Sequence, residues 1–287
     1  MRILIAALLL LLAVPTRAEP IRVVASFSVL ADIARNAGGE NVVVTSLIGP
    51  DIDPHGYESK PSDARKLAGA SVLLVNGLGF DSWADRLATA SGFHGRRVVA
   101  TASIMPILHD GLPDPHAWQS AANVLLYVDA ITDALVAARP DEADALRNSA
   151  SSYKASLSAL DQEIRATLAP IPPERRRLIV PHRAFDYFGR DYGLAFLAPL
   201  GTDADAEATA SGMAGLVEKL RRGEVRAIFA EHLEDRRIVE RIAAETGQPI
   251  AGELYSDALS PAGGPAATYI DLMRRNARII GAALAPP

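Results

Sequence analysis

The stretch DEADALRNSASSYKASLSALDQEIRATL, residues 141–168, divides this sequence into two similar halves. It contains neither glycine nor proline, and its apolar residues recur every three or four positions, as on one face of a helix, at Leu146, Ala150, Tyr153, Leu157, Leu160, Ile164 and Leu168. Its 28 residues would form a helix of roughly 42 Å at about 1.5 Å each. Pro140 suits the start of this helix, and prolines at 170, 172 and 173 stop it. A helix of that length can run across two lobes.

Short apolar segments alternate with amphipathic ones on both sides of this helix. Strands are expected at 21–26, 42–48, 71–76 and 97–100 before it, and at 177–180, 194–197, 226–230 and 249–254 after it. Helices are expected between them, over 27–37, from 61, over 81–90 and 117–138, from the end of the fifth strand through 187, and over 213–222, 235–245 and 268–283. This alternation is typical of parallel sheets covered by helices. We therefore expect an α/β fold of two lobes, each with a four-stranded, mostly parallel sheet flanked by helices, joined by one long interlobe helix.

Residues 1–18 are expected to form a cleaved signal peptide. An early positive charge is followed by an apolar run over 3–14 and by a small residue, Ala18, at the expected cleavage position. Such a run is too short to span a bilayer, which takes about 20 residues. No cysteine follows it to carry a bacterial lipid anchor. We expect a soluble periplasmic protein with an N-terminal lobe over 19–139, the interlobe helix over 140–169 and a C-terminal lobe over 170–287.

The composition argues against several classes of protein. The chain has no cysteine, which removes disulfides, thiolate metal sites and cysteine nucleophiles. Its formal net charge is −5, and it has no concentrated basic stripe, so nucleic acid is not an expected partner. The densest basic run, residues 175–177, fits a solvated strand start better.

Three of the six histidines share one local setting, with a proline directly before them and a predicted strand upstream. They are His55, His116 and His182, in Asp53-Pro54-His55, Asp114-Pro115-His116 and Pro181-His182. Proline restricts its own backbone and that of the residue before it, so each imidazole stands on a stiff segment. Ligands of open α/β sheets lie beyond the carboxyl ends of the strands, where all three histidines are expected. Asp257 follows the last predicted strand and falls on the same side.

Three neutral imidazoles and one carboxylate are a common ligand set for tetrahedral Zn²⁺. Nitrogen ligands favour the later first-row metals over Mg²⁺, Ca²⁺ and Mn²⁺. Asp257 is the preferred fourth ligand because its loop, residues 256–261, is polar and rich in turn-forming residues. Three other acidic residues also lie near predicted strand ends, namely Glu58, Glu231 and Glu253. Each half of the chain supplies two ligands, so a bound ion would join the lobes.

The sequence around each Pro-His pair resembles a ligand motif of the zinc/manganese solute-binding proteins of ABC importers, the cluster A-I family. The motifs are Asp53-Pro54-His55-Gly56-Tyr57-Glu58 with Pro61-Ser62-Asp63, then Asp114-Pro115-His116-Ala117-Trp118, then Pro181-His182-Arg183-Ala184-Phe185-Asp186-Tyr187-Phe188. The loop of Asp257 matches the position of the family's fourth ligand, a carboxylate. The resemblance covers the mature chain nearly end to end. It implies that the metal ligands are His55, His116, His182 and Asp257.

The resemblance also implies a function, which is capture of Zn²⁺ in the periplasm and delivery to an ABC transporter permease in the inner membrane. Family members that carry manganese usually have glutamate where His182 stands, which favours the zinc branch. The loop over 104–114 is short and contains one histidine, His109, whereas many zinc members have a long histidine-rich loop there. The fourth motif also departs from the family's commoner Asp-Pro-Leu. We expect a monomer. A periplasmic zinc metallochaperone is a candidate second partner.

Two alternatives remain at this point. One keeps the fold and changes the cargo to Mn²⁺ or Fe²⁺. The other is a secreted zinc hydrolase with Asp257 or Glu58 as its general base, but the chain lacks His-Glu-x-x-His and similar motifs. Four protein ligands leave no open position for water, so we expect a binding protein and not an enzyme. The long helix also predicts that release involves local movement of the loops bearing His182 and Asp257.

The other histidines are expected to lie outside the ligand set. His94 stands in a turn, and His109 in the loop before the second motif. Glu231 and His232 lie at a predicted strand end that faces the expected cleft. Either one is a candidate partner for the second ring nitrogen of a ligand. Trp118 is expected to pack in the cleft wall.

Overall fold

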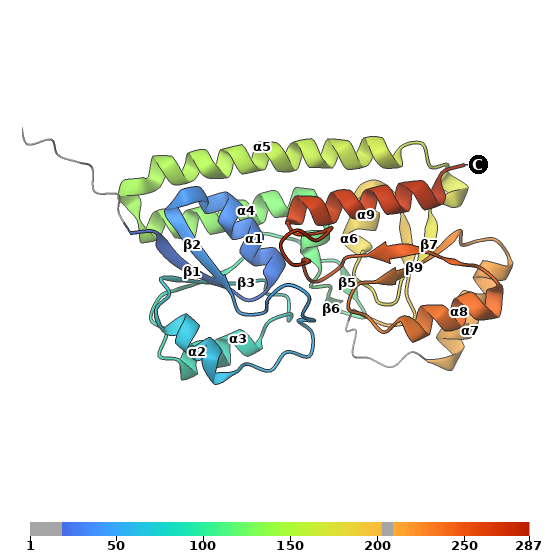
Figure 1. The fold of residues 1–287 in the computed structure, drawn as a ribbon, viewed down its shortest axis with the longest axis horizontal. Helices are drawn as coiled ribbons and strands as arrows, with labels where there is room; N and C mark the ends of the chain where they lie inside the picture. Colours follow the sequence, from blue (N-terminus) through green and yellow to red (C-terminus); the bar gives the residue numbers. More distant parts are fainter. Residues whose placement is uncertain (1–18, 203–208, 287) are drawn as a thin grey trace, which may run out of the picture.

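The computed structural model describes residues 19–202 and 209–286, which form two lobes side by side beneath one long helix (Figure 1). The predicted signal peptide, 1–18, lies outside the described residues. Each lobe is built on one four-stranded sheet in which every neighbouring pair of strands is parallel. The predicted alternation of strands and helices is confirmed on both sides of the long helix.

The sheet of the first lobe has the strand order β2-β1-β3-β4. Its strands are β1 (Ile21–Ala25), β2 (Val42–Ser46), β3 (Val72–Val75) and β4 (Arg96–Val99). Its helices are α1 (Ser28–Gly38), α2 (Pro61–Ala68), α3 (Trp83–Ala90) and α4 (Ala121–Ala138). All four residues of β3 are buried, as an apolar strand covered on both faces should be.

The sheet of the second lobe has the strand order β10-β9-β7-β8. Its strands are β7 (Arg177–Ile179), β8 (Ala195–Leu197), β9 (Ala227–Glu231) and β10 (Ile250–Leu254). Its helices are α6 (Asp186–Tyr192), α7 (Ala210–Arg221), α8 (Arg236–Thr246) and α9 (Tyr269–Leu284). The carboxyl ends of β7 and β9 point toward the first lobe, so the loops that follow them meet loops of that lobe (Figure 1).

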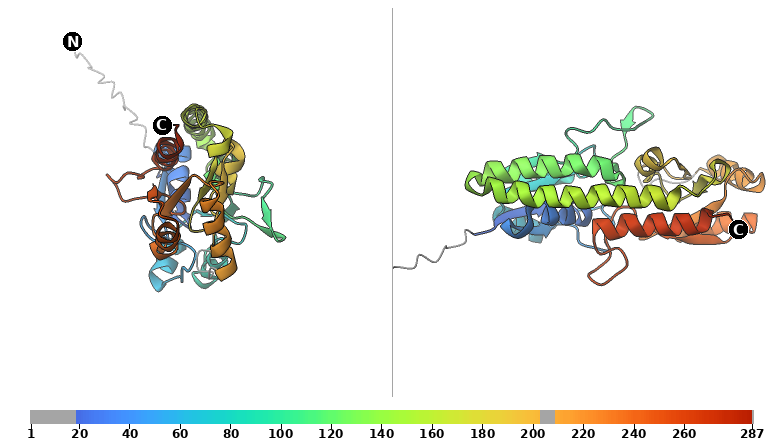
Figure 2. Two further views of the ribbon diagram at one scale, coloured as in Figure 1. Left: turned by 90° about the vertical axis from the view of Figure 1, so that its right-hand side faces the viewer. Right: turned by 90° about the horizontal axis from the view of Figure 1, so that it is seen from above.

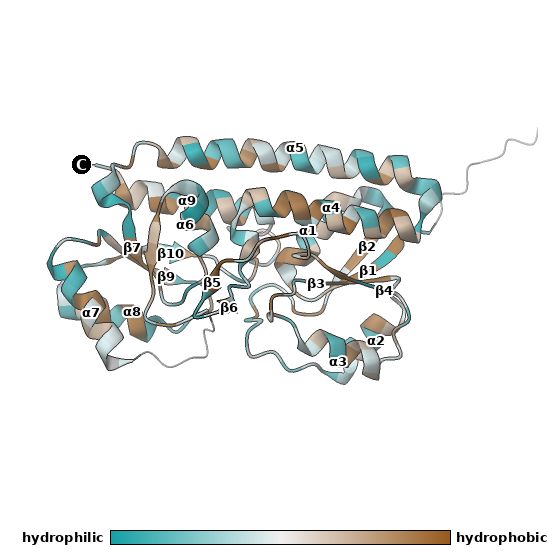
Figure 3. Cartoon of the chain, turned by 180° about the vertical axis from the view of Figure 1, so that it is seen from behind, coloured by the Kyte–Doolittle hydropathy of each residue, from teal (hydrophilic) through white to brown (hydrophobic). Residues whose placement is uncertain are grey.

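The long helix is α5 (Ala143–Leu168), which has 26 residues and runs along both lobes (Figures 1 and 2). The seven apolar residues that the sequence places on one face are the seven buried residues of this helix. They pack against α1 and α4 in the first lobe and against α9 in the second, and the outward face is mostly hydrophilic (Figure 3). The start of the predicted helix is a separate 3₁₀ turn, Pro140–Glu142. One rigid element therefore spans both lobes.

The helix α4 is apolar enough, by length and composition, to cross a membrane. In this fold half of its residues are buried, and it packs on α1, α5 and the first sheet. Its apolar composition is accounted for by this position in the core.

Two predicted helices have different bounds in the structure. The helix expected over 117–138 is interrupted at Ser120, whose backbone is extended and whose hydroxyl accepts a hydrogen bond from the backbone N–H of Asn123. The helix expected directly after β7 begins only at Asp186. The backbone N–H of His182 donates to Glu231 and that of Arg183 donates to the carbonyl of Gly201 at 2.8 Å, so this segment pairs with other parts of the second lobe. His182 consequently stands on an irregular loop.

A hairpin occupies part of the loop predicted before the second motif. It consists of β5 (Leu108–His109) and β6 (Leu112–Pro113), paired antiparallel. Asp110 and Gly111 between them both have positive φ, 52° and 83°, as a two-residue Asp-Gly turn requires. The hairpin projects from the body of the molecule (Figure 2).

Candidate metal centre

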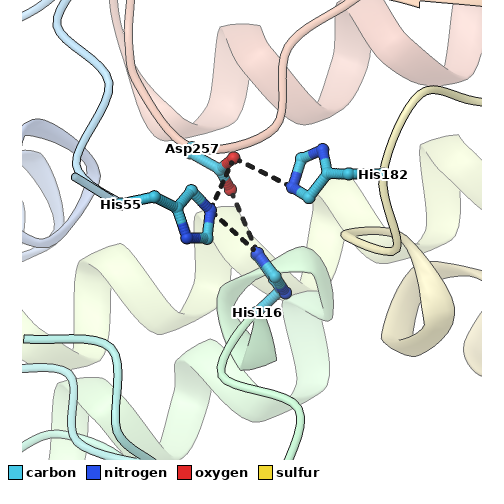
Figure 4. Close-up of side chains that lie close together, drawn as sticks. All are labelled: His55, His116, His182 and Asp257. Atoms are coloured by element: carbon cyan, nitrogen blue, oxygen red, sulfur yellow. Dashed lines mark hydrogen bonds and ion pairs between the residues drawn. The ribbon is translucent and has the colours of Figure 1, made fainter. Parts of the chain in front are cut away.

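The four predicted ligands lie together between the lobes (Figure 4). Nε2 of His55 lies 3.5 Å from Nε2 of His116. Asp257 Oδ2 lies 3.4 Å from Nε2 of His55 and 3.2 Å from Nε2 of His182, and its Oδ1 lies 3.6 Å from Nε2 of His116. All three imidazoles thus present the same ring nitrogen to one carboxylate.

These separations suit a small cation at the centre. A tetrahedral ion with bonds of about 2.0–2.1 Å holds neighbouring ligand atoms roughly 3.3–3.4 Å apart. The observed separations of 3.2 to 3.6 Å bracket that value. His182 Nε2 and Asp257 Oδ1 are also buried and have no hydrogen-bond partner among the described residues. Buried polar atoms are normally paired, so the donor set fits a cation that would satisfy them.

The two Asp-Pro-His segments hold their histidines in the same way. In each, the aspartate side chain accepts a hydrogen bond at 2.9 Å from the backbone N–H of the histidine two residues later, Asp53 from His55 and Asp114 from His116. Asp114 also contacts Nδ1 of His116 at 2.8 Å. That contact fixes Nδ1 as the protonated nitrogen and leaves Nε2 free to bind a metal. This role of Asp114 was missed, although the repeated Asp-Pro-His pattern was its signal.

Glu231 contacts the same two groups of His182, the backbone N–H by a hydrogen bond and Nδ1 by an ion-pair contact without hydrogen-bond geometry. Its Oε1 accepts the backbone N–H of His182 at 3.1 Å, and its Oε2 lies 2.9 Å from Nδ1. Glu231 ends β9 and is buried, so the second sheet positions this histidine directly. Of the two partners considered from the sequence, Glu231 makes the contact, whereas His232 faces Asp51 at 2.8 Å.

Asp257 is buried, with 4% of its surface exposed, although its loop was expected to be polar and free. The hydroxyl of Ser256 donates to Asp257 Oδ2 at 3.0 Å. The backbone carbonyl of Ser256 accepts the indole N–H of Trp118 and the amide of Gln119, at 2.9 and 2.7 Å. The segment that follows His116 in the first lobe thereby fixes the carboxylate of the second. Trp118 is fully buried, as expected for a wall residue.

The charges of the centre are strongly coupled. Burial opposes the charged form of His182, but Glu231 and Asp257 outweigh it, so the pKa of His182 is raised well above its ordinary value. Burial likewise opposes the charged form of His55, and the hydrogen bond to Asp257 raises the pKa of His55 nonetheless. Burial would raise the pKa of Asp257, yet the charges of His182 and His116 hold it well below its ordinary value. The contacts with Asp257 thus favour the charged forms of His55, His182 and Asp257 together.

A surface pocket of about 350 Å³ lies beside the centre. His55, whose side chain is 7% exposed, lines it together with Phe80 and residues of β6. Phe80 also packs edge-on against the His55 ring, with centroids 5.3 Å apart. Of the four clustered residues, His55 is therefore the one next to a path from solvent.

The other residues considered from the sequence lie elsewhere. Glu58 and His94 are exposed. Glu253 pairs with Arg236 at 3.1 Å. His109 lies on the hairpin and contacts Asp186 at 3.0 Å. None of them joins the four clustered residues.

A comparison of sequences places the chain in a known family. The profile of the family described as ZnuA, zinc-uptake complex component A, periplasmic, matches residues 23–283. The chain belongs to this family. ZnuA family members are metal-binding, periplasmic substrate-binding proteins that work with ABC transporter permeases, and they are not enzymes. The expectation of a binding protein is confirmed, and the hydrolase alternative is set aside.

Relatives of this ZnuA family protein are named for different metals. The manganese-binding lipoprotein MntA of Halalkalibacterium halodurans is 34% identical over 260 residues, 90% of this chain and 86% of its own. The iron-binding protein YfeA of Yersinia pestis is 32% identical over 263 residues, 89% and 84% of the two chains. The solved structure of the periplasmic zinc-binding protein TroA from Treponema pallidum aligns with a TM-score of 0.86 at 29% identity, over 94% of this chain and 100% of that one. The predicted fold class is confirmed, and the bound metal is not specified by these names.

Proposed function

We propose that this protein captures Zn²⁺ between its two lobes and delivers it to an ABC transporter permease for high-affinity zinc uptake. The observation that carries the proposal is the convergence of three imidazole Nε2 atoms on one carboxylate, with separations of 3.2 to 3.6 Å. In this proposal His55, His116, His182 and Asp257 bind the ion. The two lobes supply two ligands each, so metal binding and lobe contact depend on one another.

The donor set supports zinc over the Mn²⁺ or Fe²⁺ alternative. Three imidazoles are nitrogen donors of intermediate softness, which suit Zn²⁺, whereas Mn²⁺ prefers carboxylate, carbonyl and water oxygens. Both buried carboxylates behind the histidines, Asp114 and Glu231, face Nδ1 atoms and not the centre. Among the four proposed ligands, three are therefore nitrogen donors and only Asp257 supplies oxygen. The names MntA and YfeA keep manganese and iron as the competing cargoes.

In the proposed mechanism, the supporting carboxylates prepare the site before the ion arrives. Asp114 lies 2.8 Å from Nδ1 of His116 and Glu231 lies 2.9 Å from Nδ1 of His182, so both rings turn Nε2 toward the centre. The ion displaces protons from the imidazoles and takes their place beside Asp257. Release occurs by local movement of the loops that carry His182 and Asp257, because α5 packs on helices of both lobes and resists a wide opening.

Competition between metals tests the cargo. Chelator-stripped protein is dialysed against equal concentrations of Zn²⁺, Mn²⁺ and Fe²⁺ under reducing, oxygen-free conditions, and the bound metal is quantified. We expect one tightly bound equivalent of zinc. A preference for manganese or iron would overturn the zinc assignment while leaving the family assignment intact.

Replacement of single ligands tests the site. His55→Ala and His182→Ala should each weaken zinc binding by at least about 100-fold, because each variant lacks one of the four proposed bonds to the ion. His94→Ala removes an exposed histidine of the same type and should change nothing. Equal losses in all three variants would mean that binding depends on stability and not on these ligands.

Location and assembly are further parts of the proposal. We propose that export removes residues 1–18, and that the mature monomer has an N-terminal lobe over 19–139, the interlobe helix over 140–169 and a C-terminal lobe over 170–287. Intact mass spectrometry of protein from the periplasmic fraction tests the cleavage position. A mass that includes a lipid, or a start other than Glu19, would contradict it.

A further inference from the structure

A second cluster of possible metal ligands lies on the far side of Asp114 from the first. Nε2 of His109 lies 3.0 Å from Oδ2 of Asp186 and 3.6 Å from Oδ2 of Asp114. One ligand atom from each of these residues lies within 4.8 Å of the other two. None of the three belongs to the four residues of the main centre.

The Asp114 carboxylate has one oxygen that its known role does not use. Oδ1 contacts the backbone N–H and Nδ1 of His116, whereas Oδ2 has no hydrogen-bond partner among the described residues. Asp114 is fully buried, and leaving a buried carboxylate oxygen unpaired is costly. Nε2 of His109 is also buried and has no partner of hydrogen-bond geometry among the described residues. The two atoms lie 3.6 Å apart, and because Arg183 donates to Nδ1 of His109, Nε2 carries the ring hydrogen and must lose it to bind a cation.

The cluster is held in place by hydrogen bonds between the lobes. The backbone N–H of Ile107 donates to the hydroxyl of Tyr187 at 3.1 Å, and that hydroxyl donates to the backbone carbonyl of Asp114 at 2.9 Å. Tyr187 is the neighbour of Asp186 in α6. These bonds fix the base of the hairpin that carries His109 against the second lobe, so the three ligand candidates keep their mutual positions.

We infer that His109, Asp114 and Asp186 form a second site for a divalent cation of the zinc type. One imidazole nitrogen and two carboxylate oxygens suit Zn²⁺, with water completing the coordination. The side chains of His109 and Asp186 are 21% and 22% exposed, so the second site is open to solvent on one side. It binds more weakly than the main centre and exchanges its ion with the surroundings.

Arg183 competes with a cation for the imidazole of His109. Its Nη1 lies 2.9 Å from Nδ1 of His109 and donates to it. A metal on Nε2 requires the proton to sit on Nδ1, where Arg183 then cannot donate. The guanidinium must turn away for the cation to bind, which lowers the affinity and makes the second site responsive to Arg183.

Asp114 links the second site to the main centre. Its Oδ1 orients His116, and its Oδ2 faces His109, so a single carboxylate borders both sites. The inference does not depend on which metal the main centre carries. It assigns a function to the single histidine of the hairpin.

Titration of the untagged, chelator-stripped mature protein with Zn²⁺, followed by calorimetry, tests the inference. We expect two equivalents in the native protein, the second much weaker than the first. His109→Ala and Asp186→Asn should keep the first equivalent and weaken the second by at least about 10-fold. Arg183→Gln should strengthen the second. His94→Ala, the matched control, should keep both.

The outcomes separate this inference from the proposed function. A single equivalent up to millimolar zinc, or a second equivalent that survives in both His109→Ala and Asp186→Asn, would overturn the second site alone. Retention of the first equivalent shows that each variant is folded. Loss of the first equivalent in His182→Ala, with the second retained, would support both assignments, whereas a native protein that binds no zinc would refute both.

Discussion

The indole N–H of Trp118 donates a hydrogen bond to the backbone carbonyl of Ser256 at 2.9 Å. The amide of Gln119 donates to the same carbonyl at 2.7 Å. Trp118 and Gln119 follow His116 in the first lobe, and Ser256 precedes Asp257 in the second. The two bonds therefore join the backbone beside one proposed ligand to the backbone beside another. Because all of these groups are buried, the loss of either bond is costly.

Trp118→Phe should weaken zinc binding by about 10-fold, because the loss of a supporting hydrogen bond lets the Asp257 loop move. Competition with a fluorescent zinc chelator measures the change. Trp83→Phe is the matched control, since the indole N–H of Trp83 is buried without a hydrogen-bond partner among the described residues. Equal effects in the two variants would show that the bond to Ser256 does not matter for binding.

Glu231→Gln should lower zinc affinity by about 10- to 100-fold, since the amide keeps the size of the side chain and removes the charge that stabilises Nδ1–H of His182. Isothermal titration calorimetry measures the zinc affinity of this variant. Glu253→Gln serves as the control, because Glu253 lies in the adjacent strand β10 and pairs with the half-exposed Arg236. An unchanged affinity in Glu231→Gln would contradict the positioning role.

Zinc affinity should fall as the pH falls. The pKa values of His182 and His55 are raised above the ordinary histidine value, and zinc binds only the neutral imidazole. Lowering the pH through these raised values protonates the ligands, so proton competition begins at a higher pH than for ordinary histidines. Asp257, with its lowered pKa, stays ionised throughout this window. Calorimetry in buffers of different ionisation enthalpy should show proton release on binding, and the absence of proton release near pH 7 would refute this expectation.

Leu157→Ala should destabilise the protein by about 2–5 kcal/mol, the usual cost of removing a buried leucine side chain from a core. Leu157 is 1% exposed and lies on the inward face of α5. Ser156→Ala changes the neighbouring outward position and should cost little. Urea unfolding of both variants measures the difference, and similar free energies of unfolding would contradict the packing assigned to this face.

Hydrogen exchange should reveal local rather than lobe-wide differences between zinc-loaded and chelator-treated protein. The helix α5 packs on helices of both lobes, so its backbone amides should exchange slowly in both states. Faster exchange without zinc should be confined to the loops over 180–185 and 255–260. If whole lobes changed their exchange rates, release would involve a wide hinge motion instead.

Much of this architecture follows from local patterns in the sequence. The seven apolar residues of 141–168 became the buried face of α5, because helical periodicity and burial are both properties of one contiguous segment. The strands were predicted for the same reason. The proximity of the four clustered residues could also be predicted from the sequence. Three Pro-His pairs and Asp257 each follow a strand, and the carboxyl ends of parallel strands lie at one edge of a sheet.

Other features were decided by contacts between segments distant in the sequence. The irregular loop before α6 is tied to β9 by the bond from His182 to Glu231, 49 residues away. The position of the Asp257 carboxylate depends on Trp118, 138 residues from Ser256. The approach of His109 to Asp186 depends on a hairpin packed against another lobe. Local patterns set which segments become helices and strands, whereas hydrogen-bond partners across the lobes exist only once the chain has folded.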